Sequence, residues 1–364
     1  MKISSGILLR AILAAHSTIQ SRPVSPEYGM FRLRSGYGVD CIESFNGSTL
    51  LRNHVQFSSP IKLDRAFEFS PAIAWLGYID GIIDISLDGG YAVFSYGRSK
   101  LRKTGLDSPI FPVQQPIEGN SFSVSKDALA QLRLTAGDSE HQNIALDGIH
   151  VVQKDSETVY LCTGDGAGFQ AIESEGSISH TIVIPIESLD DAFSATGIDT
   201  IIVHEKDNHF YVEHDDIEMW FPGFGAKATL DGVCHTLFGY GDPALEISTS
   251  DISNAVVAIQ KAKPRKKSAN DPPQRAKVFT RDGLLFLVGG EEEDFYSMPI
   301  AKAEIEIPEE MSKIIFDTRI MSNLLKLGGR LWFLDDPRNG PTKFLVVNAT
   351  SRGIMMPMTL ARGG

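Results

Sequence analysis

Residues Leu146–Ile172 read LDGIHVVQKDSETVYLCTGDGAGFQAI, and the interpretation of the whole chain depends on them. Two apolar runs, Ile149–Val152 and Val159–Leu161, flank the polar segment Gln153–Thr158. β-Branched and aromatic residues on both sides of a charged turn are typical of a β-hairpin. The second run continues into Thr163–Gly168, TGDGAG, where glycine permits a positive φ and the close approach of another backbone.

The glycine loop has three possible interpretations. A phosphate-binding loop would open a helix after a strand and would need a matching Lys or a distant acid. Here the loop leads to Phe169 and Gln170–Ile172 and then to an acidic run, with no helical period and no basic residue nearby. A bulged turn between two strands is the plain structural alternative. The third interpretation, a partner-binding corner shared with a known protein family, depends on the rest of the chain.

The composition is that of an ordinary globular protein. The chain has 364 residues, of which 42% are hydrophobic and 22% charged, which is enough for two or three domains. No apolar run approaches the roughly 20 residues that span a bilayer, so no membrane association is expected. Met1–Ser17 superficially resembles a signal peptide, but Arg10 interrupts its apolar region and no clear cleavage site follows. An amphipathic first helix is therefore the preferred interpretation.

Cysteine usage and net charge narrow the possibilities further. Cys41, Cys162 and Cys234 are far apart and form no CxxC pair, so neither a disulfide framework nor a structural zinc site is expected. A reducing, cytoplasmic compartment fits this usage. The net charge of −12 argues against a protein that coats nucleic acid, because phosphate contacts need clustered Lys and Arg. It is compatible with a protein that surrounds DNA with a locally basic lining and an acidic exterior.

One pattern of elements recurs three times along the chain. Each copy begins with a helix and a hairpin, continues with a short strand that runs into a second helix, and ends with a hairpin. The opening helices are predicted at Ser5–Gln20, Ser125–Leu134 and Ser250–Lys261. The strand-to-helix segments are predicted at Phe67–Ile79, His180–Phe193 and Lys313–Leu327.

Individual residues support these helices. The apolar face of the first helix is expected to consist of Leu8, Leu9, Ile12, Leu13 and Ile19. Pro71 is expected at the first helical position of its helix, and Asp317-Thr318 is a capping signal before Arg319–Leu327, which Gly328-Gly329 should end.

The repetition predicts an α+β fold of three similar domains, each with two helices packed on antiparallel sheets. The expected domains are residues 1–115, 116–236 and 237–364. Within the third domain, Lys261–Lys277 reads KAKPRKKSANDPPQRAK, which is basic and carries two tandem prolines, so a loop is expected. This loop is either a basic arm near nucleic acid or a solvated insertion.

The C-terminal segment Gly353–Leu360, GIMMPMTL, supplies the second motif. Taken alone it is an apolar edge strand, since proline cannot donate to a strand ladder. Together with TGDGAGF it resembles the β sliding clamp, the processivity factor of bacterial DNA polymerase III. In that family a Leu-Asn-Gly, a hairpin and an Ala-Thr-Asp-Gly-His-Arg-Leu segment occur in this order. The family's chains end in Met-Pro-Met-Arg-Leu.

The resemblance implies a ring-forming, non-catalytic protein of DNA-clamp fold that needs no cofactor and no metal. Two subunits would close head to tail into a homodimer ring around duplex DNA, without sequence preference. Short peptide motifs of a DNA polymerase and a clamp loader would bind a pocket whose methionines can adapt to different partners. The implied pocket residues are Leu146, Gly164, Gly166, Phe169, Pro222, Ile354, Met356, Pro357, Met358 and Leu360. The implied DNA-lining candidates are Arg10, Arg22, Lys126, Arg133, Lys261 and Lys263.

The chain departs from the family at the polar rim of this pocket. The family's His-Arg after the glycine is here Ala167-Gly168, and its Arg before the final Leu is Thr359. Its Arg and Val after Phe-Pro are here Ala226 and Lys227. The apolar floor is retained, so partner motifs are expected to bind with altered specificity.

Two other classes of protein are alternatives to a clamp. An enzyme is not indicated, because the chain has no HExxH, no GxSxG and no Cys-His pair of recognisable spacing. His214 with Asp215-Asp216 could form a metal cluster, or equally an exposed turn. A β-rich scaffold or viral structural protein would share the repeat, but would have no reason to keep GIMMPMTL together with TGDGAGF.

Overall fold

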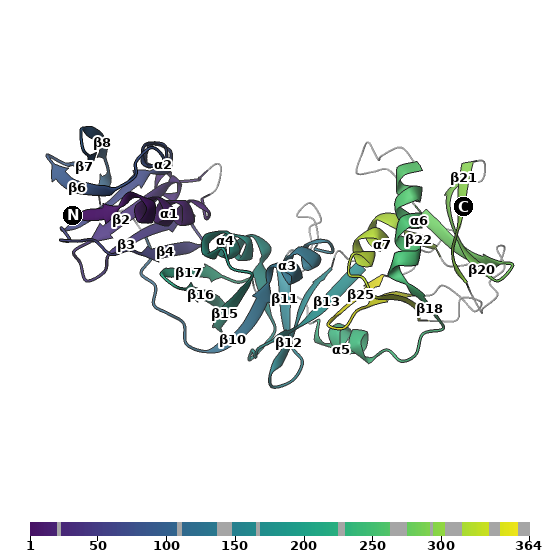
Figure 1. The fold of residues 1–364 in the computed structure, drawn as a ribbon. Coiled ribbons are helices and arrows are strands. Elements are labelled where there is room, and N and C mark those ends of the chain that lie inside the picture. The colour runs from purple at the N-terminus through teal and green to yellow at the C-terminus, as the bar shows by residue number, and fades with distance from the viewer. Residues whose placement is uncertain are drawn as a thin grey trace. The chain divides into compact units, whose positions relative to one another are not determined.

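The computed structural model describes residues 1–19, 23–107, 111–136, 148–164, 168–224, 230–262, 275–291, 294–302, 315–334 and 343–355. These residues form helices and antiparallel sheets, as expected for the predicted α+β class (Figure 1). No helix among them is long and apolar enough to cross a bilayer.

A module of one strand, one helix and three further strands occurs six times among the described residues. The first two modules are β1 (Lys2–Ser4), α1 (Ser5–His16), β2 (Met30–Ser35), β3 (Cys41–Phe45) and β4 (Leu50–His54), then β5 (Leu63–Glu68), α2 (Phe69–Leu76), β6 (Ile82–Asp88), β7 (Tyr91–Tyr96) and β8 (Ser99–Thr104). The next two are β10 (Asn120–Ser125), α3 (Lys126–Arg133), β11 (Gly148–Gln153), β12 (Thr158–Gly164) and β13 (Gly168–Glu175), then β14 (Ile182–Pro185), α4 (Ile186–Thr196), β15 (Thr200–Lys206), β16 (His209–His214) and β17 (Ile217–Pro222).

The last two modules complete the chain. They are β18 (Leu245–Ser248), α6 (Thr249–Ala262), β19 (Arg275–Arg281), β20 (Leu284–Glu291) and β21 (Asp294–Lys302), then β22 (Ile315–Asp317), α7 (Thr318–Leu325), β23 (Arg330–Phe333), β24 (Phe344–Val347) and β25 (Ser351–Met355). Three elements fall outside the pattern, namely the 3-10 helix η1 (Pro26–Gly29), β9 (Leu106–Asp107) and α5 (Asp231–Gly239).

Neighbouring modules exchange their first strands. β1 pairs with β6 of the second module, and β5 pairs with β2 of the first. The third and fourth modules exchange β10 and β14 in the same way, and the fifth and sixth exchange β18 and β22. Final strands also pair, β4 with β17 and β13 with β25, which produces sheets of nine and eight strands.

The contacts divide the chain into two compact units. Unit 1 comprises Met1–Lys126 and Ile184–Gly225, and unit 2 comprises Asp127–Val183 and Ala226–Gly364. The strand exchange explains these boundaries, because β10 pairs with β15 in unit 1 whereas the start of β14 belongs with β11 in unit 2. The division into three domains at residues 115 and 236 stays a prediction.

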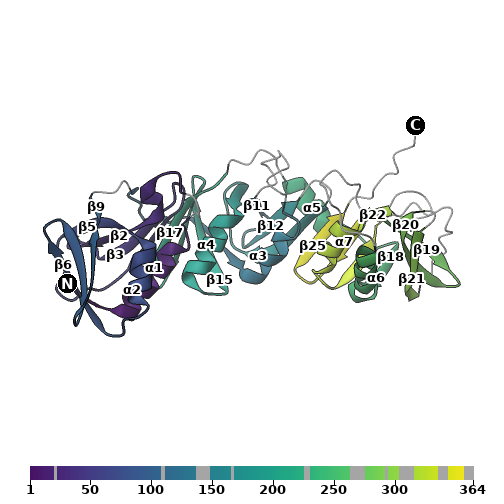
Figure 2. The same cartoon turned by 90° about the horizontal axis from the view of Figure 1, so that it is seen from above.

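In unit 1, α1 and α2 pack against each other (Figure 2). Leu8 and Ile12 are fully buried, as the predicted apolar face requires. Leu13 was wrongly assigned to that face, because its side chain is 46% exposed. The helix also ends at His16 rather than at Gln20, so Ile19 lies beyond the helix and was wrongly assigned to its apolar face.

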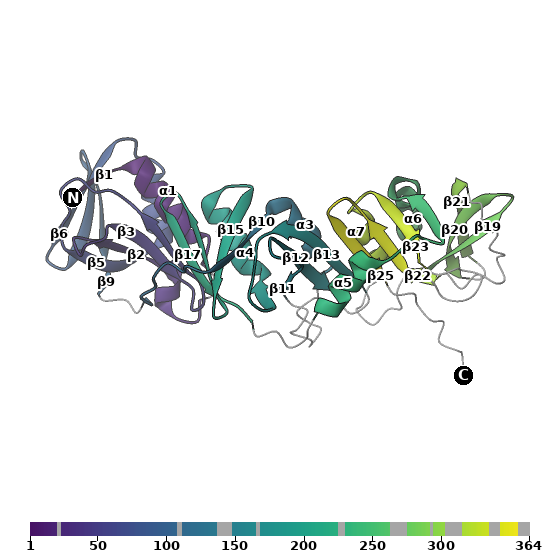
Figure 3. The same cartoon turned by 90° about the horizontal axis from the view of Figure 1, so that it is seen from below.

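In unit 2, the residues of β24 alternate between two apolar layers. Phe344 and Val346 pack with α6 and α7, whereas Leu345 and Val347 pack with α5. Figures 1 and 3 show α7 and α5 on opposite faces of this sheet. Successive side chains of a strand point to opposite faces, so a strand that is apolar throughout is covered on both sides. Sequence analysis had not predicted α5, the cover of the second face.

Two helix starts differ in how well they were predicted. The Asp317 carboxylate accepts a hydrogen bond from the Arg319 backbone N–H at 2.7 Å, which confirms the capping signal of α7. Pro71 is the third residue of α2 rather than the first. Proline is tolerated there because backbone N–H groups of the first helical turn have no partner within the helix.

The two glycines after α7 provide a matched stability test. Both have positive φ, 72° for Gly328 and 86° for Gly329. A Cβ on Gly328 would meet no atom within 4 Å, but one on Gly329 would collide with the Val347 carbonyl oxygen. Gly328→Ala should therefore cost only the left-handed strain of about 1–2 kcal/mol. Gly329→Ala should cost ~3 kcal/mol or more, because backbone atoms must also move.

Urea unfolding followed by circular dichroism measures both variants. Equal losses of stability in the two variants would show that close approach to Val347 is not what requires glycine at position 329.

Candidate functional site

Three of the predicted pocket residues lie on adjacent strands of unit 2. Gly164, the last residue of β12, pairs with Phe169 of β13. Phe169 in turn pairs with Ile354 of β25. The strand that follows the glycine loop and the strand β25, which are distant in sequence, are therefore direct neighbours in the sheet.

The remaining seven pocket candidates lie either outside the described residues or in the other unit. Six of them lie outside the described residues, namely Leu146, Gly166, Met356, Pro357, Met358 and Leu360. Pro222 belongs to unit 1, where it is the exposed last residue of β17 and pairs with His209.

Of the two reasons predicted for glycine in this loop, a positive φ and a close backbone approach, only the second applies to Gly164. Its φ lies outside the left-handed region that favours glycine. A Cβ at this position would lie 2.9 Å from the Gly168 carbonyl oxygen and 3.2 Å from Cδ2 of Phe169. The absent side chain therefore lets β12 and β13 approach closely where they enter the loop, and it leaves room beside the Phe169 ring.

An apolar cluster on the α5 face of the sheet surrounds this corner. We call it the α5 cluster, and its buried members are Val152, Tyr160, Cys162, Ala171, Cys234, Leu237 and Leu345. Partly buried side chains pack around them, including Phe169, Phe238, Trp332, Val347 and Ile354. Two of the pocket candidates, Phe169 and Ile354, are thus rim members of a packed apolar layer.

Helix α5, which covers this face of the sheet, was not predicted from the sequence. Cys234, Leu237 and Phe238 fall at i, i+3 and i+4, which is helical spacing and could have revealed the helix. The Phe238 ring stacks on Tyr160 with centroids 4.6 Å apart. Arg352 lies over the rings of both Phe238 and Trp332, 5.3 Å and 5.6 Å from their centroids.

Arg352 also brings a charge to the rim of the α5 cluster. It lies two residues before Ile354 on β25, so both side chains point to the same face of the sheet. Its Nη1 is buried and has no hydrogen-bond partner among the described residues. A buried guanidinium nitrogen without a partner is costly, and a carboxylate or carbonyl of a bound molecule could satisfy it.

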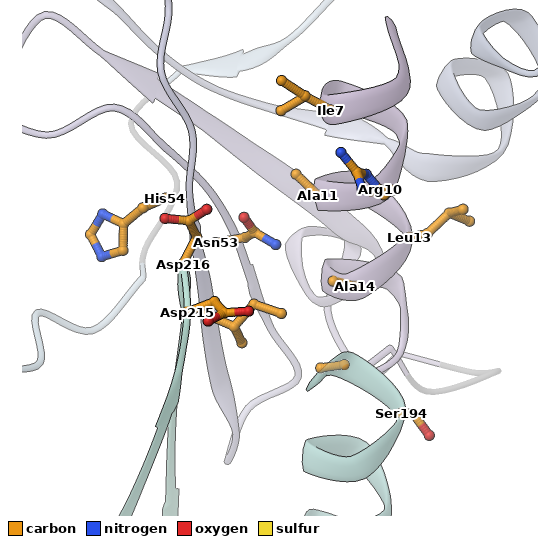
Figure 4. A pocket seen from close by; sticks show the side chains of 12 residues that line it. Ile7, Arg10, Ala11, Leu13, Ala14, Asn53, His54, Ser194, Asp215 and Asp216 are labelled. Atoms are coloured by element: carbon orange, nitrogen blue, oxygen red, sulfur yellow. The ribbon is translucent and has the colours of Figure 1, made fainter. Parts of the chain in front are cut away.

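Unit 1 contains a hollow of about 440 Å³ beside α1 (Figure 4). Ile7, Arg10 and Leu13 line it from α1, and the Asp215-Asp216 turn lines the other side. The exposed Leu13, misassigned to the core, is therefore a wall of this hollow. Asp215 and Asp216 form the two-residue turn between β16 and β17, with Asp215 at φ 50° and His214 Nε2 3.4 Å from the Asp215 carboxylate.

The predicted DNA-lining residues differ in their surroundings. Arg10, Arg133 and Lys261 are exposed on α1, α3 and α6. Lys126 is engaged by its own unit, because its Nζ lies 3.4 Å from an Asp199 carboxylate oxygen and donates to the Gly197 carbonyl. Arg22 and Lys263 lie outside the described residues.

The predicted basic loop is shorter than its composition suggested. Lys261 and Ala262 belong to α6, and Arg275–Lys277 are the first residues of β19. The residues between them, 263–274, lie outside the described residues.

Comparison with known proteins identifies the fold. No protein-family model matches the chain, and no curated protein matches it in sequence.

A putative DNA polymerase III β subunit from Eubacterium rectale superposes with a TM-score of 0.79 at 11% identity, covering 99% of each chain. The DNA polymerase sliding clamp from Bacillus subtilis gives a TM-score of 0.79 at 12% identity, over 99% of this chain and 98% of that one. The DNA polymerase III β subunit from Thermotoga maritima gives 0.74 at 17% identity, over 99% of each. The chain has the fold of a bacterial sliding clamp.

Helix α4 is acidic. Its sequence IESLDDAFSAT contains no Lys or Arg and three acids, Glu187, Asp190 and Asp191. Burial raises the pKa of the Asp191 carboxyl to about 7, and the neighbouring charges of Asp190 and Glu187 add to the effect. The carboxyl is therefore partly protonated near neutral pH, which reduces the negative charge of the helix.

The raised pKa of Asp191 predicts a specific pH dependence of stability. The folded chain holds this proton with a pKa of about 7, against about 3.9 for an aspartate in an unfolded chain. The contribution of this proton to the free energy of unfolding is thus fully present below about pH 4, and it is lost as the pH rises through 7. Asp191→Asn should raise the thermal unfolding midpoint at pH 8 and leave it nearly unchanged at pH 4.

The matched control is Asp127→Asn, which removes an exposed carboxylate from α3. It should leave the wild-type pH dependence in place. A lower midpoint for Asp191→Asn at pH 8 would contradict the assignment.

Proposed function

We propose that the chain is a DNA sliding clamp, a non-catalytic cytoplasmic subunit that holds a DNA polymerase on duplex DNA. Two copies close head to tail into a ring, and DNA passes through it. The observation that carries the proposal is the likeness in fold to bacterial sliding clamps over 99% of the chain. No cofactor takes part, because the action of a clamp is topological rather than chemical.

The edges of the sheets support ring closure. Within the chain, final strands of modules pair with each other, β4 with β17 and β13 with β25. Two final strands remain at the edges of their sheets, β8 in unit 1 and β21 in unit 2. An open edge presents backbone N–H and C=O groups to a further strand. Pairing of β8 with β21 of a second copy repeats the rule that joins modules within one chain.

Charge favours the same pairing. β8 reads SKLRKT and carries Lys100, Arg102 and Lys103. In sequence, residues 291–294, where β20 ends and β21 begins, are four consecutive acids. Opposite charges on two edges favour their association and disfavour the pairing of either edge with a copy of itself.

DNA is held by enclosure more than by direct contact. The exposed basic candidates on the helices are few, Lys126 is paired with Asp199, and α4 is acidic. Each phosphate contact contributes a slope of about 0.9 to the fall of log affinity with log salt for duplex DNA. Few contacts therefore mean weak direct binding of an open chain, while a closed ring remains on DNA that has no ends.

Arg102→Pro tests both the ring and the enclosure of DNA. The two-residue turn after Tyr96 makes Tyr96 and Ser99 a hydrogen-bonded pair, and such pairs alternate, so the Arg102 N–H points to the open edge. Proline removes that N–H without breaking the β7–β8 pairing. Wild type should be a dimer by mass photometry, whereas Arg102→Pro should be mostly monomeric.

The control Arg102→Ala loses the ion pair with Asp88 and the contact with Tyr91, but keeps the N–H, and should stay dimeric. Subunits dissociated in mild urea are then reassembled with a circular plasmid and washed in high salt. Wild type should remain on the circle and leave when the plasmid is cut, and Arg102→Pro should not be retained. Retention that is independent of cutting would instead indicate a scaffold without DNA encirclement.

The corner of Gly164, Phe169 and Ile354 is proposed as the floor of the partner pocket. An extended peptide can bury one or two apolar anchors against the rim of the α5 cluster, and a polar group of the peptide can reach Arg352. Met356, Met358 and Leu360 continue from β25 in sequence and are proposed to complete the apolar wall. Ala167, Gly168 and Thr359 in place of larger polar groups shift the choice of partner motifs.

Phe169→Ala should weaken peptide binding by about tenfold or more, since an apolar anchor site typically contributes at least 1–2 kcal/mol. Met358→Ala should act in the same direction. The probe is a fluorescein-labelled pentapeptide in extended form with Leu and Phe as its anchors, titrated by calorimetry and fluorescence polarisation.

Phe286→Ala is the matched control, because Phe286 is also a partly buried phenylalanine of unit 2. It stacks on Phe279, and both lie in a different sheet from Phe169. It should bind the peptide as wild type does. Unchanged affinity in both Phe169→Ala and Met358→Ala would refute the pocket.

A further inference from the structure

Two cysteines that are far apart in sequence meet beneath α5. Cys162 lies on β12 and Cys234 on α5, and both side chains are fully buried in the α5 cluster. Their sulfur atoms lie 3.0 Å apart. The optimal separation of two non-bonded carbon atoms is about 3.5–4.0 Å, and sulfur is larger than carbon. The two sulfurs are thus closer than an ordinary packing contact.

We propose that Cys162 and Cys234 are a redox modification site, at which a reversible disulfide fastens α5 to the sheet. A disulfide requires a sulfur separation of about 2.05 Å, so the sulfurs need to approach by only about one ångström. No rearrangement of β12 is needed, because the movement can be taken up by the short helix alone.

Helix α5 is weakly held in the reduced chain. Among the side chains of α5 that the structure describes, only Cys234 and Leu237 are fully buried, while Gly232, Val233, His235 and Thr236 are exposed. Its first turn has no side-chain cap, and a helix of this length is not stable by itself in water. Packing alone holds α5 only partly against the sheet. A covalent link between Cys234 and Cys162 of β12 would hold it more firmly.

Weak attachment also explains how a buried pair can react. The thiols are covered when α5 is in place, and an oxidant reaches them when the helix lifts. The oxidant is a small peroxide, and hydrogen peroxide is the simplest compound of this class. The rate of oxidation is then set by the opening of α5 and is slower than for an exposed thiol.

The chemistry balances in two steps. The first thiolate attacks hydrogen peroxide and, with one proton taken up, gives a sulfenic acid and water. The second thiol attacks that sulfenic sulfur, the S–S bond forms, and the hydroxyl leaves as a second water. Together two thiols lose two electrons and two protons to one peroxide. A dithiol such as dithiothreitol reverses the link by thiol–disulfide exchange.

Cys41 provides a control within the same chain. It is buried in unit 1, where burial, together with the charge of Glu43, raises the pKa of its thiol to about 12. The thiolate is the reactive form, so Cys41 should remain reduced under conditions that oxidise the pair.

The experiment exposes the full-length chain to hydrogen peroxide, quenches it in acid, alkylates the remaining thiols under denaturing conditions, and maps peptides by mass spectrometry. The expected product is a cross-linked peptide that joins Cys162 to Cys234 and is 2 Da lighter than its two reduced parts, with Cys41 alkylated. The thermal midpoint of the transition that includes α5 should rise by roughly 5–10 °C, and dithiothreitol should reverse both changes. Cys41→Ser should behave as wild type.

Cys234→Ser should abolish the cross-link and the rise in midpoint. Cys162→Ala is the second variant, in case the serine loosens α5. Sulfinic acid at either cysteine without a cross-linked peptide, or alkylation of all three thiols after prolonged exposure, would overturn the proposal. These readouts need neither DNA nor a peptide, so their outcome is independent of the clamp function.

Discussion

The exchange of first strands between neighbouring modules is the constraint on which the rest of the structure depends. A module cannot complete its own sheet, because its first strand pairs within the sheet of its neighbour. Modules therefore fold in pairs, and each pair exposes its final strands. β4 and β13 find partners within the chain, while β8 and β21 remain at sheet edges. The pairing of final strands, which joins modules within one chain, thus also indicates how two chains would pair.

Sequence analysis predicted the local structure well and the long-range structure only through resemblance. The hairpin around Gln153–Thr158 follows from alternation and a charged turn, and the start of α7 follows from Asp317, because in both cases neighbouring residues interact. The pairing of Phe169 with Ile354 has no local signal, since the pattern of one strand does not specify a distant partner. Leu13 was misassigned because helical spacing identifies apolar residues but does not show how wide the buried face is.

The charge of the helices is consistent with a protein that depends on enclosure. A surface that binds duplex DNA by itself needs many phosphate contacts. Here Lys126 is held by Asp199, and α4 offers acids in place of bases. The partial protonation of Asp191, whose pKa burial raises to about 7, reduces the repulsion without making the surface attractive. Weak contact fits the proposed sliding clamp, because strong phosphate contacts would slow its movement along DNA.

The two apolar faces of the sheet in unit 2 explain why a half-buried apolar corner, the proposed partner pocket, lies at β13 and β25. One face is covered by α6 and α7, each held by several fully buried side chains. The other face is covered by a helix of nine residues, which is too short to reach the whole apolar layer. Phe169 and Ile354 lie at the rim of that layer and stay half-buried. These half-buried apolar side chains lie beside the Arg352 guanidinium, whose Nη1 is buried. Together they form a surface on which a short peptide can bury its own apolar side chains. The shortness of α5 therefore leaves the rim open and also makes an additional link to the sheet useful.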